Sequence, residues 1–389
     1  MLNRLFFQGV AAAASLLALG VSAQDQQACN GYAEFCSRPY SDLTYVLTHN
    51  SYAYMANPAA NQQCDISAQL TDGVRALRLS AVKPDNSSDI HLCHTSCSFL
   101  DDGPAQDTLS TLATWLKDNP NEVLTVMWNV PNQDFWASDF QAPYEASGIL
   151  EYAHVQEQQN LTWPTLQDLI TSGKRLINFV DVNADQNSVP WLHSQYDYVF
   201  ETPYDNKNES SFTCTIDRPE NPVNPQQMMY GMNHFLYGSL PWGDNVIQIP
   251  QSGSASVTNS HDSLMLQANE CNQAFGARPN FLIVDFYNRG QTLEIAAELN
   301  NVTYDSSKEL VCDKSSTNTG SDNSDSAASS LQIFISSPFI ATLLLVGLVM
   351  TFIPIHCGAR IHVMKDRDKA TTIWAIRPPS SSGRRADHP

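Results

Sequence analysis

Two short segments of this chain are almost continuously apolar. They are residues 175–181 (RLINFVD) and 280–287 (NFLIVDFY). Runs of this kind are typical of strands whose two faces are both buried, as in the parallel sheet of an α/β protein. Further β-type runs occupy residues 43–48, 74–82, 89–94, 122–129 and 198–201. A sheet of buried parallel strands is therefore the first expectation.

Helical patterns lie between several of these strands, at residues 107–118, 165–172, 225–235, 263–275 and 292–299. Alternation of strands and helices through residues 24–312 predicts an α/β fold, with a TIM-type (β/α) barrel as the first choice and a doubly wound open sheet as the second. The first strand is not followed by a glycine-rich phosphate loop, which counts against the open sheet. The chain has 389 residues, enough for one barrel of about 250 residues.

Both ends of the chain resemble membrane-targeting segments. Residues 1–23 combine an early positive charge, an apolar stretch and a VSA ending, which predicts a cleaved signal peptide. Residues 333–355 carry no charge and are long enough for a single transmembrane helix. Residues 313–332 are rich in Ser, Asn and Asp and predict a solvated stalk. The basic residues 356–389 predict a cytoplasmic tail, as in a single-pass type I membrane protein.

Two alternatives to this topology stay open. The apolar segment could be a buried core helix, and a GPI-anchor signal also has small residues and a polar spacer before an apolar run. A GPI signal should end with that run, whereas here 34 residues follow it. A lipid anchor would fit only if those residues are removed. In either case the barrel ectodomain would lie outside the cell or in the secretory lumen.

Charge and cysteines agree with that location. The formal net charge of −19 disfavours nucleic acid and anionic membrane surfaces as partners of the main domain. Eight of the nine cysteines precede residue 313, and an even number in an oxidising compartment predicts disulfides. Cys29–Cys36 and Cys93–Cys97 are close enough for local pairs, and the other pairings stay open. Four glycosylation sequons lie on the same side, at Asn86, Asn160, Asn208 and Asn301.

Polar side chains end several of the apolar runs. His49 and Asn50 follow the first strand in VLTHNSY, His94 follows another in IHLCHTSC, and Asp181 and Asp285 end two more. In a (β/α) barrel, active-site residues lie where the strands end. The pattern therefore predicts two histidines and two carboxylates around one rim. Such a histidine pair suits general acid–base catalysis, in which one ring accepts a proton and the other donates one.

The run VRALRLSAV places two arginines in one strand. Arg75 and Arg78 are three residues apart, so their side chains point to opposite faces. A charge within so apolar a strand needs a partner. We expect Arg78 to face the pocket, where it could neutralise a phosphoryl oxygen. We expect Arg75 to be a structural ion-pair residue outside the barrel.

The remaining histidines give weaker signals. His91, Cys93, His94 and Cys97 raise the question of a zinc site, but His91 and His94 should face opposite sides of a strand. The cysteines are better explained by disulfides, so no metal site is predicted. His234 and His261 are expected on the surface: the sequence indicates no partner for either of them.

Four motifs carry a resemblance to a known family. THNSY, QLTDGVR at residues 69–75, LCHTSC and DNPNEV at residues 118–123, in this order and spacing, resemble the PLC-like phosphodiesterases. That superfamily includes the catalytic domain of phosphatidylinositol-specific phospholipase C, and the similarity is greatest to secreted or membrane-anchored fungal members, over roughly residues 28–300. The resemblance implies a TIM-type barrel, a phospholipid-like phosphodiester substrate, and His49 and His94 as the catalytic pair. It also implies that Asp285 orients the first histidine.

The sequence departs from the family pattern at the metal site. In the calcium-dependent phospholipases an asparagine follows the first histidine, and Asn50 matches it. Their acidic ligands would fall at Arg78, Ser80 and Trp128 of this chain. Ca²⁺ needs several oxygen ligands, so calcium is improbable and no cofactor is expected. The metal-free bacterial enzymes have an aspartate and an arginine at the positions of Arg78 and Ser80, so that pattern is broken too.

Two functions follow from this comparison. The first is a metal-independent phosphoric diester hydrolase or lyase, in which Arg78 supplies the positive charge and Asn50 and Asp181 contact the substrate. The second is a catalytically inactive, membrane-tethered barrel that acts as a binding or cell-surface protein.

Overall fold

The structure is a computed structural model that describes residues 27–317, except residues 55, 86, 95 and 243–244. The predicted signal peptide (1–23), transmembrane helix (333–355) and basic tail (356–389) lie outside the described residues. The predicted stalk (313–332) lies outside them beyond residue 317, and its first residues belong to helix α9 (Val311–Thr317) instead. Among the described helices, none is both long and apolar enough to cross a membrane.

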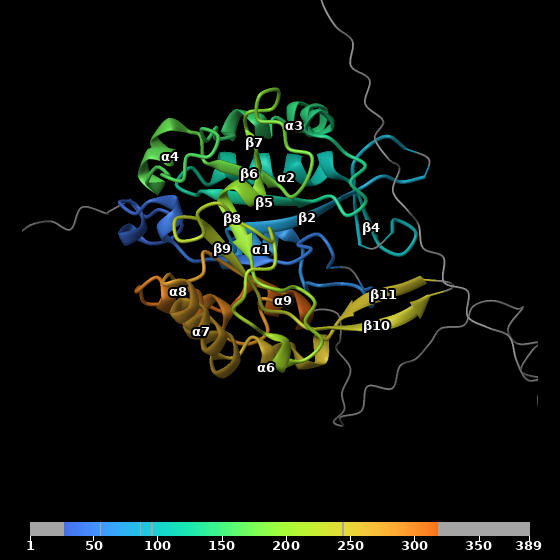
Figure 1. Ribbon diagram of the computed structural model, residues 1–389, viewed down its shortest axis with the longest axis vertical. Helices are drawn as coiled ribbons and strands as arrows, with labels where there is room; N and C mark the ends of the chain where they lie inside the picture. The colour runs from blue at the N-terminus through green and yellow to red at the C-terminus, as the bar shows by residue number, and fades with distance from the viewer. Residues whose placement is uncertain (1–26, 55, 86, 95, 243–244, 318–389) are drawn as a thin grey trace, which may run out of the picture. The chain divides into compact units, whose positions relative to one another are not determined.

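A curled sheet of eight parallel strands lies at the centre of the fold (Figure 1). The strand order is β7-β6-β5-β2-β1-β12-β9-β8. The strands are β1 (Tyr45–Thr48), β2 (Ala76–Val82), β5 (Leu124–Asn129), β6 (Leu176–Val180), β7 (Leu192–Ser194), β8 (Val199–Glu201), β9 (Met229–Asn233) and β12 (Phe281–Val284). The predicted α/β class and parallel sheet are confirmed. The two end strands, β7 and β8, share no strand pairing in the described part of the chain, so the sheet is curled but not closed.

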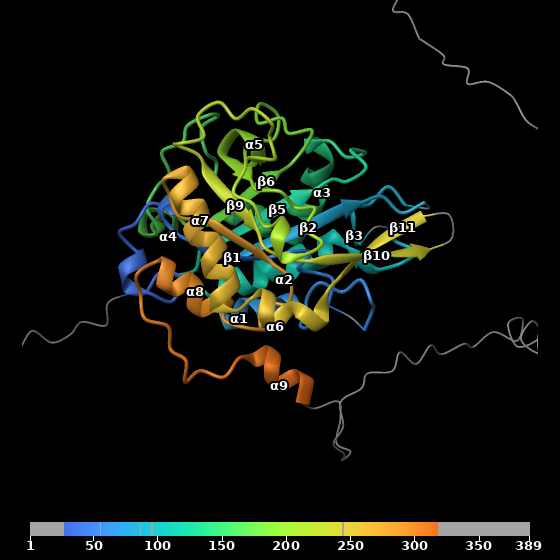
Figure 2. The ribbon, with the colours of Figure 1, turned by 60° about the horizontal axis from the view of Figure 1, so that its bottom comes forward.

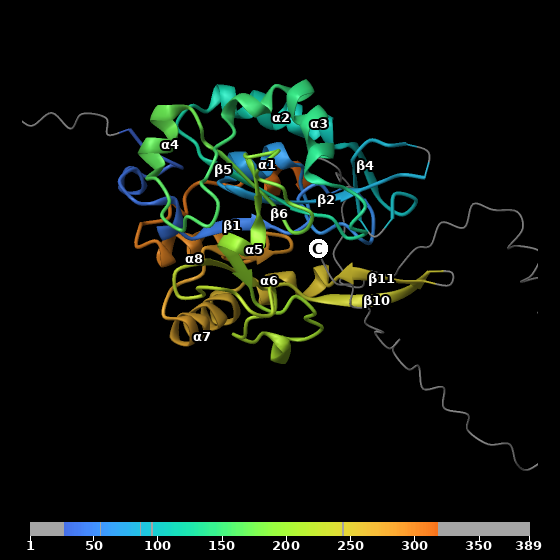
Figure 3. The same cartoon turned by 45° about the horizontal axis from the view of Figure 1, so that its top comes forward.

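Helices cover the curled sheet on its outside. Figures 1 and 3 show α2, α3 and α4 along one side and α6, α7 and α8 along the other. The helices before α9 are α1 (Ile66–Asp72), α2 (Ala105–Asp118), α3 (Gln141–Ser147), α4 (Leu166–Ser172), α5 (Gln195–Tyr198), α6 (Ala255–Thr258), α7 (Leu266–Phe275) and α8 (Thr292–Leu299).

Local sequence explains where several helices begin and end. The side chain of Asp65 accepts a hydrogen bond from the backbone of Ala68 at the start of α1, and Gly73 ends the helix with a φ of 116°. In α4, Thr165 and Asp168 form a capping box. Side-chain acceptors at the first turn satisfy backbone N–H groups that have no partner within the helix. Glycine ends a helix well because it adopts positive φ without strain.

The apolar runs of the sequence are explained by burial on two faces. Phe281 and Ile283 of β12 pack in one apolar cluster, whereas Leu282 and Val284 pack in another. Successive side chains of a strand point to opposite faces, so each face of β12 meets its own apolar layer. Such a strand has no solvent-facing positions and therefore no need for polar residues.

One secondary-structure prediction was wrong, and one predicted strand lies outside the parallel run. The segment predicted as a helix at residues 225–235 contains strand β9, all of whose residues are buried between β8 and β12. The strand predicted at residues 89–94 exists as β3 (His91–Cys93), but it pairs antiparallel with β2 and with β4 (Asp101–Pro104). It pairs with the last residues of β2 and does not belong to the run of parallel strands.

An antiparallel hairpin was not predicted at all. Strands β10 (Tyr237–Trp242) and β11 (Asn245–Pro250) pair with each other and form a separate two-stranded sheet. Figure 2 shows them side by side, extending away from the parallel sheet. The sequence carries no strict alternation of apolar and polar residues here, which explains why the hairpin was missed.

Four disulfides connect the described cysteines. Cys29–Cys36 and Cys93–Cys97 are the predicted local pairs and are confirmed. The two pairings left open by the sequence are Cys64–Cys312 and Cys214–Cys271. Cys64–Cys312 joins residues 248 positions apart, and it ties α9 to the segment before α1.

Candidate active site

A cavity of about 510 Å³ opens at the carboxyl ends of the parallel strands. Five of the six residues predicted for the site line this cavity, and the sixth, Asp285, lies directly behind one of them. The five are His49, Asn50, Arg78, His94 and Asp181. The structure therefore brings all six together.

His49 and Asp285 form a hydrogen-bonded pair. Thr48 of β1 lies beside Val284 of β12, so the next residue of each strand emerges at the same place. His49 Nδ1 lies 2.9 Å from Asp285 Oδ1, and Asp285 is only 6% exposed. The His49 ring also stacks on Phe235, with 4.2 Å between ring centroids. Both contacts fix the orientation of the imidazole.

Asn61 supports this pair from the loop after β1. Its Nδ2 donates a hydrogen bond to Asp285 Oδ1 at 2.9 Å, and its Oδ1 accepts one from Asn50 Nδ2 at 3.1 Å. Ser80 Oγ in turn donates to Asn50 Oδ1 at 3.0 Å. A chain of side-chain hydrogen bonds thus links Ser80 on β2 to the carboxylate behind His49.

His94 enters the cavity from a different direction. It follows β3, and the Cys93–Cys97 disulfide closes the turn around it. His94 is buried, with 8% of its surface exposed. Burial, together with the charge of His49, lowers the pKa of His94 to about 4. The ring is therefore neutral at pH 7, whereas a general acid must carry a proton.

Arg78 forms a cluster with two residues that were not predicted. Its guanidinium donates hydrogen bonds to both carboxylate oxygens of Glu201, and Arg218 Nη2 donates to Glu201 Oε2 at 2.5 Å. Glu201 is fully buried. Burial alone would raise the pKa of Glu201, but the two arginines hold it well below its usual range. Glu201 is therefore a carboxylate at neutral pH.

Asp181 lines the cavity but contacts neither histidine. Its Oδ1 accepts a hydrogen bond from the backbone of Val130 at 2.9 Å, and its Oδ2 accepts one from Asn129 Nδ2 at 2.5 Å. Burial raises the pKa of Asp181, and these hydrogen bonds oppose that effect. These hydrogen bonds hold the carboxylate in place at the cavity wall, and no residue in the described part of the chain forms an ion pair with it.

Comparison with known proteins places this geometry in a family. The family described as PI-PLC X 1 matches residues 35–300. The PI-PLC X domain-containing protein 1 of Arthroderma benhamiae is 35% identical over 281 residues, which are 70% of this chain and 90% of that protein. The chain belongs to the PI-PLC X domain family. The resemblance inferred from the sequence motifs is thereby confirmed.

Two further proteins show how far the similarity extends. An uncharacterized secreted protein of Arthroderma benhamiae is 36% identical over 290 residues, or 71% of this chain. The match spans 64% of that relative, which is slightly less than two thirds of its length. The phosphatidylinositol-specific phospholipase C of Listeria monocytogenes is 16% identical with a TM-score of 0.46, over 69% of this chain and 96% of that one.

The residues in the place of the PI-PLC calcium ligands do not fit the ion. The Oδ1 atom of Asn50 already accepts the hydroxyl of Ser80, and the guanidinium of Arg78 lies in the same cavity wall. A guanidinium repels a cation and offers it no oxygen ligand.

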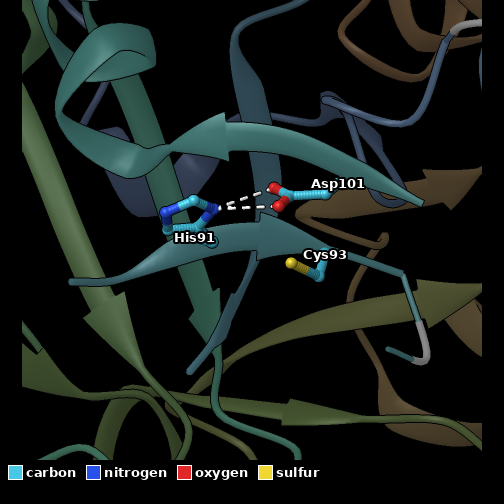
Figure 4. Close-up of side chains that lie close together, drawn as sticks. All are labelled: His91, Cys93 and Asp101. Carbon is cyan, nitrogen blue, oxygen red and sulfur yellow. Dashed lines mark hydrogen bonds and ion pairs between the residues drawn. The ribbon is translucent and has the colours of Figure 1, made fainter. Parts of the chain in front are cut away.

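A second group of potential metal ligands lies on the β3–β4 pair. In the described residues, His91, Cys93 and Asp101 are the group whose ligand atoms lie within 4.8 Å of one another. Figure 4 shows His91 and Asp101 pointing toward each other across the two strands, and His91 Nδ1 lies 3.0 Å from both carboxylate oxygens. Cys93 is bonded to Cys97, so it has no thiolate for a metal.

Three expectations about other residues can be compared with the structure. Arg75 forms the expected structural ion pair, with Glu122 Oε2 at 2.7 Å. His261 is half-exposed, as expected, and pairs with Glu298. The prediction for His234 was wrong. It is fully buried, with Nδ1 2.5 Å from Gln267 Oε1 and Nε2 2.7 Å from the Thr258 carbonyl oxygen.

The sequence analysis missed Glu201, Arg218, Asn61 and Phe235. Glu201 had a usable signal, because it ends an apolar strand just as Asp181 follows one. Arg218 lies in a long loop with no periodic pattern, and Asn61 and Phe235 reach the site from loops as well. Loop residues are brought to a site by tertiary contacts that local sequence does not encode.

Proposed function

We propose that this chain is a phosphoric diester hydrolase or lyase of the phospholipase C type that works without a metal. The observation that carries the proposal is the cavity shared by His94 and the His49–Asp285 pair. Membership of the PI-PLC X domain family supports the same chemistry, and one of the relatives carries the PI-PLC X domain name. The proposed substrate is a phospholipid or a similar phosphodiester.

In the proposed mechanism, His49 accepts the proton of the attacking hydroxyl at Nε2. The resulting imidazolium keeps its Nδ1–H directed at Asp285, whose charge stabilises it. The hydroxyl oxygen bonds to phosphorus while the bond to the leaving oxygen breaks, and His94 gives that oxygen a proton. Since His94 is neutral in the free protein, the anionic phosphodiester must raise its proton affinity on binding.

The other cavity residues are proposed to hold the substrate. Arg78 contributes positive charge beside the phosphoryl group, and Asn50 and Asp181 contact polar groups of the head group. Arg78 stands at the position of an acidic metal ligand in the calcium-dependent phospholipases. Its guanidinium can supply the positive charge that calcium supplies in those enzymes.

The location and domain layout are part of the proposal. We infer a signal peptide at residues 1–23, a catalytic barrel domain at 24–312, and a stalk, a transmembrane helix and a cytoplasmic tail at 313–332, 333–355 and 356–389. The ectodomain would act outside the cell or in the secretory lumen. The four disulfides of the described residues and the secreted relative support an extracellular setting.

An inactive surface-binding protein is the second candidate. Two observations favour it: the low pKa of His94 and the occupation of the Arg78 guanidinium by Glu201. A neutral His94 lacks the proton that a general acid must give, and an arginine bonded to Glu201 has fewer donors for a phosphate.

The deciding experiment is turnover by the purified full chain in the presence of EDTA. Substrates are phosphatidylinositol vesicles and glycerophosphodiesters, and the variants are His49→Ala and His94→Ala, with His261→Ala as a surface control. Each active-site variant should lower the rate about 10²- to 10⁴-fold, the usual contribution of a general acid or base. Equal rates in wild type and both variants would favour the binding protein, and stimulation by added calcium would contradict the metal-free proposal.

A further inference from the structure

The two arginines that share Glu201 differ in how many donors they have left. Arg78 uses both terminal nitrogens on Glu201, and its Nη2 also lies 3.7 Å from Met127 Sδ. Its side chain is 9% exposed. Arg78 is therefore committed to protein partners, although it borders the cavity.

Arg218 has donors to spare. Only its Nη2 reaches Glu201. Its Nε is buried and has no hydrogen-bond partner among the described residues, and Asp217 Oδ2 is 3.9 Å from it. The side chain is 28% exposed and lines the cavity. A buried donor without a partner is costly, so an acceptor is expected to bind there.

The position of Arg218 is fixed before any ligand binds. Its guanidinium lies over the ring of Tyr204, 4.3 Å from the centroid. Its backbone oxygen accepts a hydrogen bond from the backbone of Glu201 at 2.8 Å. The disulfide Cys214–Cys271 ties the same loop to α7. A donor held in this way loses little entropy when a ligand binds.

The charges of this cluster do not cancel. Among the three hydrogen-bonded groups, the single carboxylate of Glu201 faces the guanidinium groups of Arg78 and Arg218, so these three carry one net positive charge. Asp181 also influences both arginines, but its oxygens are bonded to Asn129 and Val130. Asp217 lies 3.9 Å from Arg218 Nε, beyond hydrogen-bond distance, and its side chain is 39% exposed, so it is a weaker partner than buried Glu201. The remaining charge belongs to the more exposed guanidinium.

We propose that Arg218 binds a non-bridging oxygen of the substrate phosphate and is a catalytic residue, whereas Arg78 is a positioning residue held by Glu201. This refines the role given to Arg78 above and rests on the proposed phosphodiester chemistry. A planar guanidinium with free N–H groups matches phosphate oxygens. It stabilises the charge that these oxygens carry in the transition state.

The test must distinguish two roles of Arg218: binding the substrate phosphate, and balancing the buried negative charge of Glu201. The central comparison is therefore Glu201→Gln against the double variant Glu201→Gln/Arg218→Met, because neither contains the buried charge that Arg218 would otherwise balance. Glu201→Gln/Arg218→Lys restores the charge without the planar fork. Arg278→Met is the matched control, since Arg278 is also 28% exposed and pairs with Asp42 away from the cavity.

Three quantities are measured on the full chain: turnover of phosphatidylinositol vesicles, binding of inorganic phosphate by calorimetry, and stability to urea. Relative to Glu201→Gln, the double variant with Met should lose about 100-fold or more in kcat/KM, at unchanged stability, and should no longer bind phosphate. The Lys variant should recover part of the loss, and Arg278→Met should match wild type. Should Glu201→Gln not fold, Arg218→Met and Arg218→Lys are compared directly with wild type.

The outcomes distinguish the two proposals. Equal kcat/KM in Glu201→Gln and the double variant overturns the role of Arg218 and leaves the phosphodiesterase proposal standing. A wild type that binds phosphate through Arg218 but cleaves no phosphodiester overturns the proposed function and keeps the phosphate site. A wild type that neither cleaves a phosphodiester nor binds phosphate overturns both.

Discussion

His94 should make the stability of this protein depend on pH between 7 and 5. Its folded-state pKa is lowered to about 4 by burial and by the charge of His49, from an ordinary value near 6.5. Between pH 7 and pH 5, His94 therefore becomes protonated in the unfolded chain but stays neutral in the folded protein. Stability from this residue is complete above pH 6.5 and is lost as the pH falls toward 4.

The size of the effect follows from the shift. A difference of about 2.5 pKa units corresponds to roughly 3.4 kcal/mol when the titration is complete, at 1.36 kcal/mol per unit. Between pH 7 and pH 5 the unfolded imidazole becomes almost fully protonated and the folded one hardly at all. Integrating the linkage relation over that interval gives about 2 kcal/mol for His94 alone.

The assay is urea unfolding at pH 7 and pH 5 with the disulfides intact, on wild type and on His94→Asn. The variant should lose about 2 kcal/mol less than wild type between the two pH values, whatever its absolute stability. His261→Asn, which removes a half-exposed histidine, measures the background effect of such a change. The same pH dependence in wild type and His94→Asn would refute the argument that His94 is neutral because it is buried.

Three other substitutions test single contacts. Asp285→Asn should lower phosphodiester turnover about 10²-fold or more in initial-rate assays, because the carboxylate no longer stabilises protonated His49, and near-normal rates would contradict the proposed pair. Arg75→Met should lower the free energy of unfolding by about 1–3 kcal/mol, since it leaves Glu122 partly buried without its ion-pair partner. Joint replacement of Cys64 and Cys312 by Ser should cost about 4–5 kcal/mol, because that disulfide closes a loop of 248 residues, and an unchanged urea midpoint would argue against it.

The strands that the sequence predicted best are those buried on both faces. The run at β12 is apolar throughout because Phe281 and Leu282 face different apolar clusters. A strand buried on both faces can therefore be recognised from its uninterrupted apolar sequence. Strand β9, with the sequence MYGMN, is equally buried but contains Met, Gly and Asn, which have no strand preference. Its pairing with β8 and β12 decides its conformation, and that pairing is not a local property.

The site was predictable to the extent that it is made from strand ends. His49 and Asp285 each follow a buried strand directly, and the parallel register of β1 and β12 is what places them 2.9 Å apart. Arg218 reaches the same cavity from a loop fixed by a disulfide and by backbone contacts to Glu201. Its position depends on contacts across the chain, so no pattern around residue 218 could have indicated it.

Burial of His94 determines when the proposed catalyst becomes active. In the free protein, neutral His94 cannot act as a general acid at pH 7, and Arg218 Nε has no acceptor among the described residues. The phosphate group of a bound phosphodiester would change both features. Its negative charge favours protonated His94, and its oxygens accept hydrogen bonds from Arg218. Under the proposed mechanism, the acid is therefore formed only when substrate is present. A smaller anion in the same cavity would raise the pKa of His94 in the same direction, which links phosphate binding to proton uptake.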